Sequence, residues 1–208
     1  MSSGTENQEL SSDAQRLLER IAEAFGSESV PDAFAAYGQQ EVFLKDLMMN
    51  LKKFVAGDGS LEQKTRLLIA LATAAHAKSD VWTSWLSQIA TQKEIDRQTQ
   101  IDSLAVASTN YMYNTFFKFR HLSGSDRFEG LSVGLRAHTF SGTSLDDATV
   151  ELINIAISDL NACPPCVSGH VAKAKKLDLS DEQILEAVQC ASTVYAGCQF
   201  LSSAGMLP

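Results

Sequence analysis

The sequence predicts an all-α protein, and three observations lead to that prediction. Apolar residues recur three or four positions apart over long segments, as they do on one face of a helix. Only four prolines occur in 208 residues, so these segments run uninterrupted. Apolar residues make up 45% of the chain and charged residues 20%, proportions that are typical of a globular protein. The length suits one domain, or a compact pair of similar halves.

Residues 1–11 are expected to form a disordered tail, followed by a single helical domain over residues 12–208. In the first half, polar capping residues and glycines mark where the apolar-periodic segments begin and end. Ser60, with Gln63 three residues later, has the pattern of a capping box. The segment 128–140 is expected to be a helix or an irregular apolar stretch. The helices expected before it cover residues 12–25, 40–55, 60–77, a segment that begins at Asp80, and 96–119.

The second half resembles the first when the chain is shifted by 84 residues. The coinciding pairs include Leu61 with Leu145, Ile69 with Ile153, Ala107-Ser108-Thr109-x-Tyr111 with Ala191-Ser192-Thr193-x-Tyr195, and the expected caps Ser60 with Ser144 and Asp96 with Ser180. We therefore expect two pseudo-repeated helical units, over about 44–122 and 128–206, that pack on each other. Residue identity between the halves is low, so the alternative is that any two helical stretches of this length align equally well.

One motif concentrates the chemistry: Cys163-Pro164-Pro165-Cys166-Val167-Ser168-Gly169-His170, with Glu151 twelve residues before the first thiol. A helix is expected over about 146–160. The residue before a proline disfavours helix, whereas proline itself is tolerated in the first turn of a new helix. We therefore expect a break at 161–162 and a second helix over about 163–177.

An antiparallel return of this second helix would bring His170 within a turn of Glu151. Cys166 and His170 are four residues apart and therefore share a helix face. In that arrangement Glu151 orients and polarises His170, and His170 accepts a proton from a thiol. The partial positive charge of the helix N-terminus stabilises a thiolate at Cys163 or Cys166.

The matching positions in the first half carry none of these functional groups. Shifted back by 84 residues, Glu151, Cys163, Cys166 and His170 fall on Leu67, Ser79, Trp82 and Leu86. If both halves share one fold, that fold does not require the four polar side chains.

The spacing Glu-x11-Cys-x2-Cys-x3-His resembles the AhpD family of alkyl hydroperoxidases and, more widely, the carboxymuconolactone decarboxylase-like superfamily. The resemblance covers most of the chain and implies an all-helical fold with an internal repeat. It also implies a thiol-dependent alkyl hydroperoxide reductase. In that reading Cys166 attacks the hydroperoxide and becomes a sulfenic acid, and Cys163 then closes a disulfide. Glu151 and His170 form the proton relay.

The same resemblance implies which partners to expect. The reductant would be a lipoylated or a thioredoxin-like protein, and the chain would form a homo-oligomer, a trimer or a hexamer. Neither a cofactor nor a metal ion is expected. One departure from the family pattern concerns the position directly before the second cysteine. Well-studied members have a histidine there, whereas this chain has Pro165, which has no proton to exchange.

Other interpretations of the motif stay open. The two thiols may simply pack in the core, or Cys163, Cys166, His170 and Glu151 may bind a zinc ion. The dithiol may belong to a disulfide reductase or redox carrier without peroxidase activity. It may also switch a non-catalytic, oligomeric redox sensor. A decarboxylase of the superfamily is a further alternative, although that branch works without the dithiol.

Composition argues against several other classes. The net charge of −8 is unlike that of a general nucleic-acid binder. No run of ~18 apolar residues exists, so no transmembrane helix is expected. The N-terminus lacks the apolar segment of a signal peptide, and we expect a cytoplasmic protein. Cys190 and Cys198 are expected to be structural thiols, and His76 to be structural or exposed.

Overall fold

The computed structural model describes residues 10–206, and every regular element within them is a helix. The predicted all-α class is confirmed. The tail expected over residues 1–11 lies, apart from Leu10 and Ser11, outside the described residues. The α-helices are α1 (Ser12–Phe25), α2 (Glu41–Leu51), α3 (Gln63–His76), α4 (Asp80–Gln92), α5 (Arg97–Leu122), α6 (Asp147–Leu160), α7 (Pro164–Lys176) and α8 (Asp181–Ala204). Shorter helical elements are η1 (Asp32–Gln39), η2 (Lys52–Ala56), η3 (Asp126–Phe128) and η4 (His138–Phe140).

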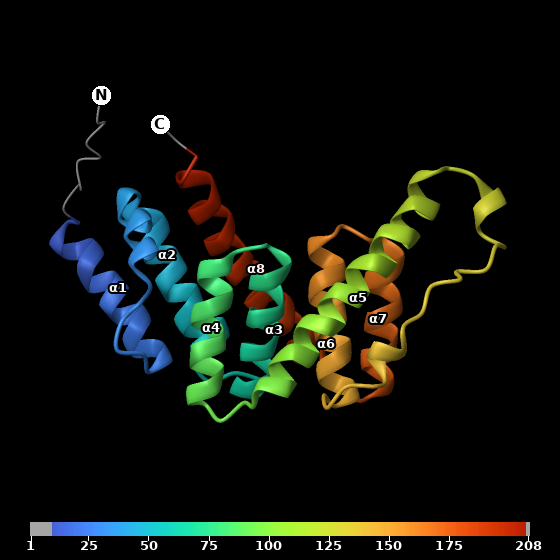
Figure 1. The fold of residues 1–208 in the computed structure, drawn as a ribbon, viewed down its shortest axis with the longest axis horizontal. Coiled ribbons are helices and arrows are strands. Elements are labelled where there is room, and N and C mark those ends of the chain that lie inside the picture. Colours follow the sequence, from blue (N-terminus) through green and yellow to red (C-terminus); the bar gives the residue numbers. More distant parts are fainter. Residues whose placement is uncertain (1–9, 207–208) are drawn as a thin grey trace.

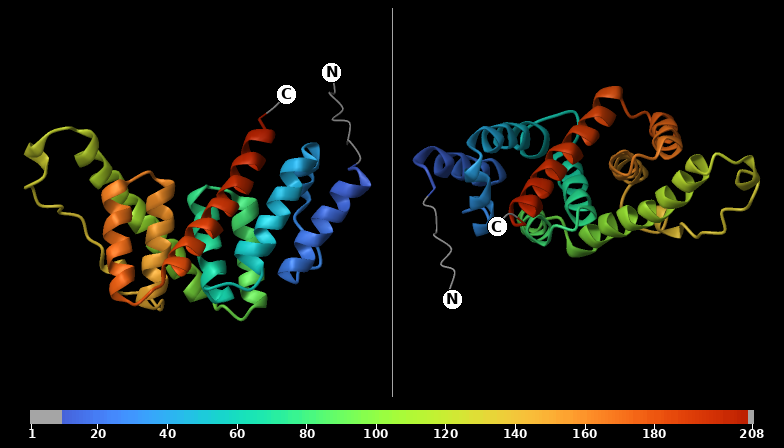
Figure 2. Two further views of the ribbon diagram at one scale, coloured as in Figure 1. Left: turned by 180° about the vertical axis from the view of Figure 1, so that it is seen from behind. Right: turned by 90° about the horizontal axis from the view of Figure 1, so that it is seen from above.

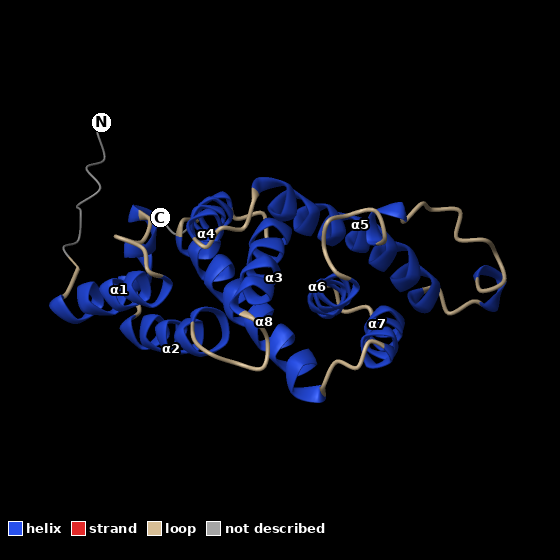
Figure 3. Ribbon diagram, turned by 90° about the horizontal axis from the view of Figure 1, so that it is seen from below, coloured by secondary structure: helices blue, strands red, loops and turns tan. Residues whose placement is uncertain are grey.

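Two helices, α3 and α6, form the centre of the molecule (Figure 1). Helix α3 packs against α4, α5, α6 and α8, and α6 packs against α3, α5, α7 and α8. The long helices α5 and α8 each contact both central helices, and Figure 2 shows α8 crossing the body obliquely. Helix α6 lies between α5 and α7 (Figure 3). Among the described residues none of the helices, α5 with its 26 residues included, is both long and apolar enough to span a membrane.

An aromatic cluster fills the contact between α4 and the end of α8. The buried indole of Trp82 donates a hydrogen bond to the hydroxyl of Tyr37 at 2.7 Å, and that hydroxyl donates to the carbonyl of Gly197 at 2.7 Å. Phe34 packs against Trp82 with ring centroids 4.7 Å apart. A Cβ atom on Gly197 would lie 2.6 Å from Cζ2 of Trp82, closer than van der Waals contact allows. The indole therefore fixes glycine at this position of α8.

Several helix boundaries follow from local capping. Asp96 caps α5 by accepting a hydrogen bond from the Thr99 amide at 3.0 Å, as expected. Ser180 caps α8, and Gln183 completes a reciprocal capping box. The helix expected over 40–55 ends earlier, at Leu51, and continues as the single π-helical turn η2.

The caps predicted at Ser60 and Ser144 are wrong. The backbone amide of Ser60 donates to the carboxylate of Glu186, and α3 begins later, at Gln63. The backbone amide and hydroxyl of Ser144 both donate to the carboxylate of Asp102 at 2.7 Å, which lowers the pKa of that carboxyl. In each case a carboxylate from a distant helix takes the serine, because a charged acceptor makes the stronger hydrogen bond.

The two serine–carboxylate pairs are related by the 84-residue shift, since Ser60 falls on Ser144 and Asp102 falls on Glu186. Each pair joins the start of one proposed unit to the last helix of the other. The internal repeat stays a prediction, and this exchange of contacts supports it.

Backbone geometry gives a second line of support for the repeat. Four non-glycine residues have positive φ angles, namely Lys78 at 56°, Glu94 at 60°, Ala162 at 49° and Asp178 at 61°. They form two pairs that are each separated by 84 residues. This left-handed conformation is uncommon for residues with a Cβ atom. Its recurrence at matched positions indicates that the α3–α4 and α6–α7 pairs are connected and ended in the same way.

Between α5 and α6 the chain extends away from the helical body (Figure 1). The segment 128–140, expected as a helix or an irregular stretch, is irregular between the short turns η3 and η4. Its side chains are mostly exposed, so little apolar burial is available to hold a regular helix there.

Substituting Gly197 with alanine is expected to destabilise the fold by about 1–3 kcal/mol, because the added methyl group overlaps the Trp82 ring. Urea unfolding followed by circular dichroism measures the effect. Gly169→Ala is the matched control, since a Cβ atom on that helical glycine meets no atom within 4 Å. The control is expected to be neutral or stabilising by up to about 1 kcal/mol. Equal stability of the two variants would contradict the proposed overlap.

Candidate active site

The motif lies where the sequence predicts a break between two helices. Helix α6 ends at Leu160, and Ala162 adopts a left-handed conformation with φ of 49°. The amide of Ala162 donates to the Asp159 carbonyl at 2.8 Å, and the amide of Cys163 donates to the Ser158 carbonyl at 3.1 Å. These bonds close the end of α6 and reverse the chain, so that α7 begins at Pro164 and runs back along α6.

Cys163 and Cys166 are joined by a disulfide, with their Cα atoms 5.3 Å apart. Cys163 precedes α7 and is fully buried, whereas Cys166 lies in its first turn and is 8% exposed. The amide of Cys166 donates to the Cys163 carbonyl at 3.0 Å, which fixes the backbone between the two sulfur atoms. Solvent therefore reaches Cys166 more readily than Cys163.

The antiparallel pairing of α6 and α7 brings Glu151 and His170 together. Oε2 of Glu151 lies 2.6 Å from Nδ1 of His170, and only 10% and 12% of the two side chains are exposed. Nζ of Lys173 lies 3.6 Å from the other carboxylate oxygen, although this lysine is largely exposed. Sequence reasoning missed Lys173. Its position three residues after His170, on the same helix face, is the signal that would have identified it.

The sulfur atoms and the imidazole occupy the same side of α7, but no hydrogen bond joins them among residues 10–206 of this disulfide form. Cys166 and His170 are one helical turn apart. The bond from Glu151 occupies Nδ1, so Nε2 is the ring nitrogen left for proton exchange. Within the same described residues, no three His, Cys, Asp or Glu side chains gather as they would around a metal ion.

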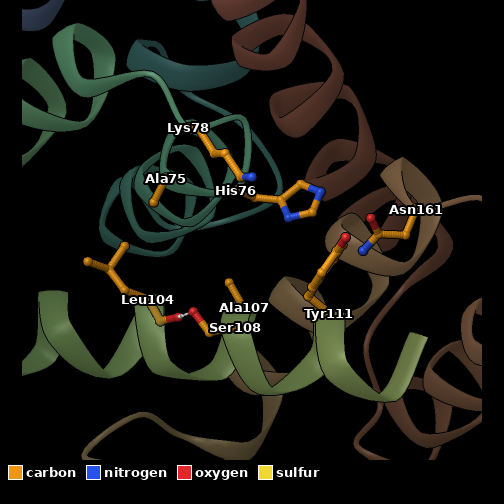
Figure 4. A pocket seen from close by; sticks show the side chains of 8 residues that line it. All are labelled: Ala75, His76, Lys78, Leu104, Ala107, Ser108, Tyr111 and Asn161. Carbon is orange, nitrogen blue, oxygen red and sulfur yellow. Dashed lines mark hydrogen bonds between the residues drawn. The ribbon is translucent and has the colours of Figure 1, made fainter. Parts of the chain in front are cut away.

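Two hollows border the α6–α7 pair. One has a volume of about 320 Å³ and reaches Glu151; it is lined by Phe140, Asp147, Val150, Glu151, Lys173, Lys176 and Leu177. The other has a volume of about 440 Å³ and ends at the turn before Cys163. In Figure 4 the side chains of His76, Tyr111 and Asn161 converge on this second hollow.

His76 was expected to be structural or exposed, and it lines this second hollow while half-buried. Burial lowers its pKa, and the nearby charge of Lys78 acts in the same direction. The imidazole is therefore uncharged at neutral pH. No sequence signal marks this hollow, because its walls come from α3, α5 and the α6–α7 turn.

The two remaining cysteines lie deep in the core on α8. Burial raises the pKa of the Cys190 thiol to about 12 and that of Cys198 to about 12. The Cys190 thiol donates a hydrogen bond to the carbonyl of Arg66 at 3.4 Å. Because the thiolate is the reactive species, these thiols are chemically inert at neutral pH.

The fold and site define an all-α protein with a dithiol at a helix start, beside a buried carboxylate–imidazole pair. Comparison with known proteins then gives the family. A model of the carboxymuconolactone decarboxylase family (CMD) matches residues 128–207. The chain is 27% identical over 176 residues to "Alkyl hydroperoxide reductase AhpD" of Anaeromyxobacter sp. (strain Fw109-5), which covers 85% of this chain and 89% of the relative.

Two further comparisons agree with this placement. The protein of the same name from Brucella suis (strain ATCC 23445 / NCTC 10510) is 28% identical over 164 residues, 78% of this chain and 91% of the relative. A Burkholderia xenovorans LB400 crystal structure, provisionally described as a gamma-carboxymuconolactone decarboxylase subunit, superposes with a TM-score of 0.64 at 15% identity. It covers 92% of this chain and 96% of its own. The predicted resemblance to AhpD and to the carboxymuconolactone decarboxylase-like superfamily is confirmed.

After reduction of the disulfide, iodoacetamide at pH 7.5 is expected to alkylate Cys166 first, because its thiol lies at the helix start and reaches solvent. Cys190 and Cys198 are expected to stay unmodified until the protein is unfolded, because burial raises their pKa to about 12. Peptide mass mapping over time measures all the sites in one sample. Labelling of either α8 thiol as fast as Cys166 in the folded protein would refute this assignment.

Proposed function

We propose that this chain is a thiol-dependent alkyl hydroperoxide reductase. The observation that carries the proposal is the 2.6 Å contact between Glu151 and His170 beside the Cys163–Cys166 pair. A buried carboxylate held against an imidazole one helical turn from a thiol is the arrangement that acid–base chemistry at that thiol requires. The similarity to proteins named AhpD supports the same activity.

The reaction begins from the reduced dithiol. His170 accepts the proton of Cys166, and the N-terminus of α7 stabilises the resulting thiolate. The thiolate attacks the terminal oxygen of the hydroperoxide and breaks the O–O bond, so that Cys166 becomes a sulfenic acid. The departing alkoxide takes a proton from His170 and leaves as an alcohol, while Glu151 stabilises the protonated imidazole.

The second step closes the disulfide. The Cys163 thiol loses its proton and attacks the sulfur of the sulfenic acid, and the hydroxyl group leaves as water when it is protonated. The dithiol thus loses two electrons, and the hydroperoxide is reduced to an alcohol and water. The structure holds the chain in the resulting disulfide form.

A partner protein must then supply a thiol to reduce the disulfide. We propose a lipoylated or thioredoxin-like reductant that attacks the sulfur of Cys166, because the sulfur of Cys163 is fully buried. We further propose a cytoplasmic homo-oligomer, a trimer or a hexamer. Exposed apolar side chains on α5 support such an assembly; they are Ile101, Tyr111, Met112, Phe119 and Leu122.

A disulfide reductase or redox carrier without peroxidase activity is the second candidate, and Pro165 is the observation that favours it. A proline next to Cys166 provides no group that can exchange a proton with a bound peroxide. This candidate needs only reversible thiol–disulfide exchange, for which the dithiol and the helix N-terminus suffice.

Substituting Cys166 with serine is expected to abolish peroxide consumption, because serine removes the nucleophile. Glu151→Gln and His170→Gln are expected to slow it by about 10²-fold or more, because each breaks the proton relay. A coupled assay with cumene hydroperoxide and a dithiol reductant measures these rates. Cys198→Ala, on α8 and away from the motif, is the control that should keep the wild-type rate. Normal turnover by the Cys166→Ser variant would disprove the mechanism.

Treating the Cys163→Ser variant with one equivalent of hydroperoxide is expected to leave a sulfenic acid on Cys166, because no second thiol remains to displace it. Trapping with dimedone and mass spectrometry of the peptide detects it. Formation of the adduct supports the peroxidase. If the reduced variant exchanges disulfides with a model substrate but forms no adduct, the redox carrier is the correct function.

A further inference from the structure

A buried chain of polar side chains crosses the contact between α5 and α6 and ends at the turn before the dithiol. The side-chain amide of Asn110 donates to the hydroxyl of Ser158 at 3.0 Å, and the amide of Asn114 donates to the same hydroxyl at 3.0 Å. The amide of Asn161 donates to the side-chain oxygen of Asn114 at 2.9 Å. Asn110, Asn114 and Ser158 are at most 1% exposed.

The same chain of bonds reaches the backbone that carries Cys163. The carbonyl of Ser158 accepts the amide of Cys163 at 3.1 Å, so one residue joins the polar chain to the first cysteine. On the outer side, Nζ of Lys118 donates to the carbonyl of Asn161 at 3.1 Å. Three residues of α5 spaced four apart, at 110, 114 and 118, therefore hold both ends of the α6–α7 turn.

The matching contact in the other half of the molecule contains no such chain. Under the 84-residue shift, Ser158 falls on Ala74, Asn161 on Ala77, Asn110 on Val194 and Asn114 on Cys198. Helices α3 and α8 pack there with small apolar side chains, most of them fully buried. The helices can therefore pack at such a contact without buried asparagines.

A buried amide that could be replaced by an apolar residue is a disadvantage for stability alone. Removing an amide from water costs free energy that its hydrogen bonds recover only in part. Asn154, also on α6 and fully buried, illustrates the cost. Its side-chain amide has no hydrogen-bond partner among the described residues, and the matching position is Ala70.

We propose that Asn110, Asn114, Ser158 and Asn161 are positioning residues that hold the α6–α7 turn in the geometry that favours the disulfide, and thereby set the reduction potential of the dithiol. The inference rests on the proposed redox function of Cys163 and Cys166. Because the amide of Cys163 is fixed to Ser158 in advance, less conformational freedom is lost when the two sulfur atoms join. A looser turn disfavours the disulfide and makes the potential less negative.

Ser158→Ala is the test, because it removes the hydroxyl that both asparagines bind while leaving the helix backbone intact. Ser103→Ala is the matched control: Ser103 is equally buried on α5, and its hydroxyl donates to the Gln100 carbonyl at 2.7 Å. The equilibrium between dithiol and disulfide is measured in glutathione or dithiothreitol buffers, with acid quenching and mass spectrometry, and urea unfolding is measured in parallel.

The Ser158→Ala equilibrium constant for disulfide formation is expected to fall about tenfold, which is ~30 mV for this two-electron couple. The Ser103→Ala variant is expected to keep the wild-type potential while losing similar stability. Asn161→Ala, at the partly exposed end of the chain, is the second variant in case Ser158→Ala folds poorly, and its potential should shift in the same direction.

Unchanged potentials in both variants, with stability lowered as in Ser103→Ala, would overturn the proposal and leave the polar chain with a packing role. The equilibrium is measured without any peroxide. A chain that shows the shift yet reduces no hydroperoxide would therefore contradict the proposed peroxidase and retain the positioning role. A chain that reduces hydroperoxides but shows no shift gives the opposite result.

Discussion

The nearly complete burial of α6 is the constraint on which the rest of the site depends. Ten consecutive residues of this helix, from Thr149 to Ser158, are buried, because α3, α5, α7 and α8 surround it. A polar side chain on such a helix cannot be satisfied by bulk water, so it must find a partner in a neighbouring helix or pay the cost of desolvation. Glu151 finds His170 on α7, and Ser158 finds the asparagines of α5.

This constraint explains how the molecule keeps reactive groups in fixed positions. The carboxylate of Glu151 has two cationic or polar neighbours from α7, so the imidazole it contacts cannot turn away without leaving a buried charge unpaired. An interior of low dielectric also strengthens the hydrogen bond between them. At the other end of α6 the polar chain fixes the backbone next to Cys163 in the same manner. One buried helix thus holds the proton-exchanging pair and the dithiol turn together.

The parts of the site that sequence predicts well are those fixed by local chemistry. Two prolines after Cys163 specify a helix start, and the residues before them specify a break, so the antiparallel return and the closeness of Glu151 to His170 follow. The caps at Ser60 and Ser144 fail because carboxylates from distant helices compete for the same amides. Sequence periodicity carries no information about such partners.

The chain of asparagines was missed for the same reason. Asn110 and Asn114 lie more than forty residues before Ser158, and an asparagine inside a long helix looks like a solvated side chain until its partner helix is known. Helix α6 itself was expected to be amphipathic, whereas it is buried on every face. Length and periodicity do not distinguish a surface helix from a central one when small residues and a few polar groups interrupt the apolar pattern.

The contrast between the two halves shows what replaces the site where no chemistry is needed. The position that matches Cys166 holds Trp82, whose ring packs with Phe34 and against Gly197, and whose indole nitrogen is satisfied by Tyr37. A large aromatic side chain contributes more apolar burial than a thiol, and a satisfied indole leaves no polar group unpaired. Folded proteins are only marginally stable, so buried asparagines and a buried carboxylate around the dithiol are tolerated only if apolar packing elsewhere offsets their cost. The aromatic cluster of the first half supplies packing of that kind, which allows the second half to retain the polar groups on α6.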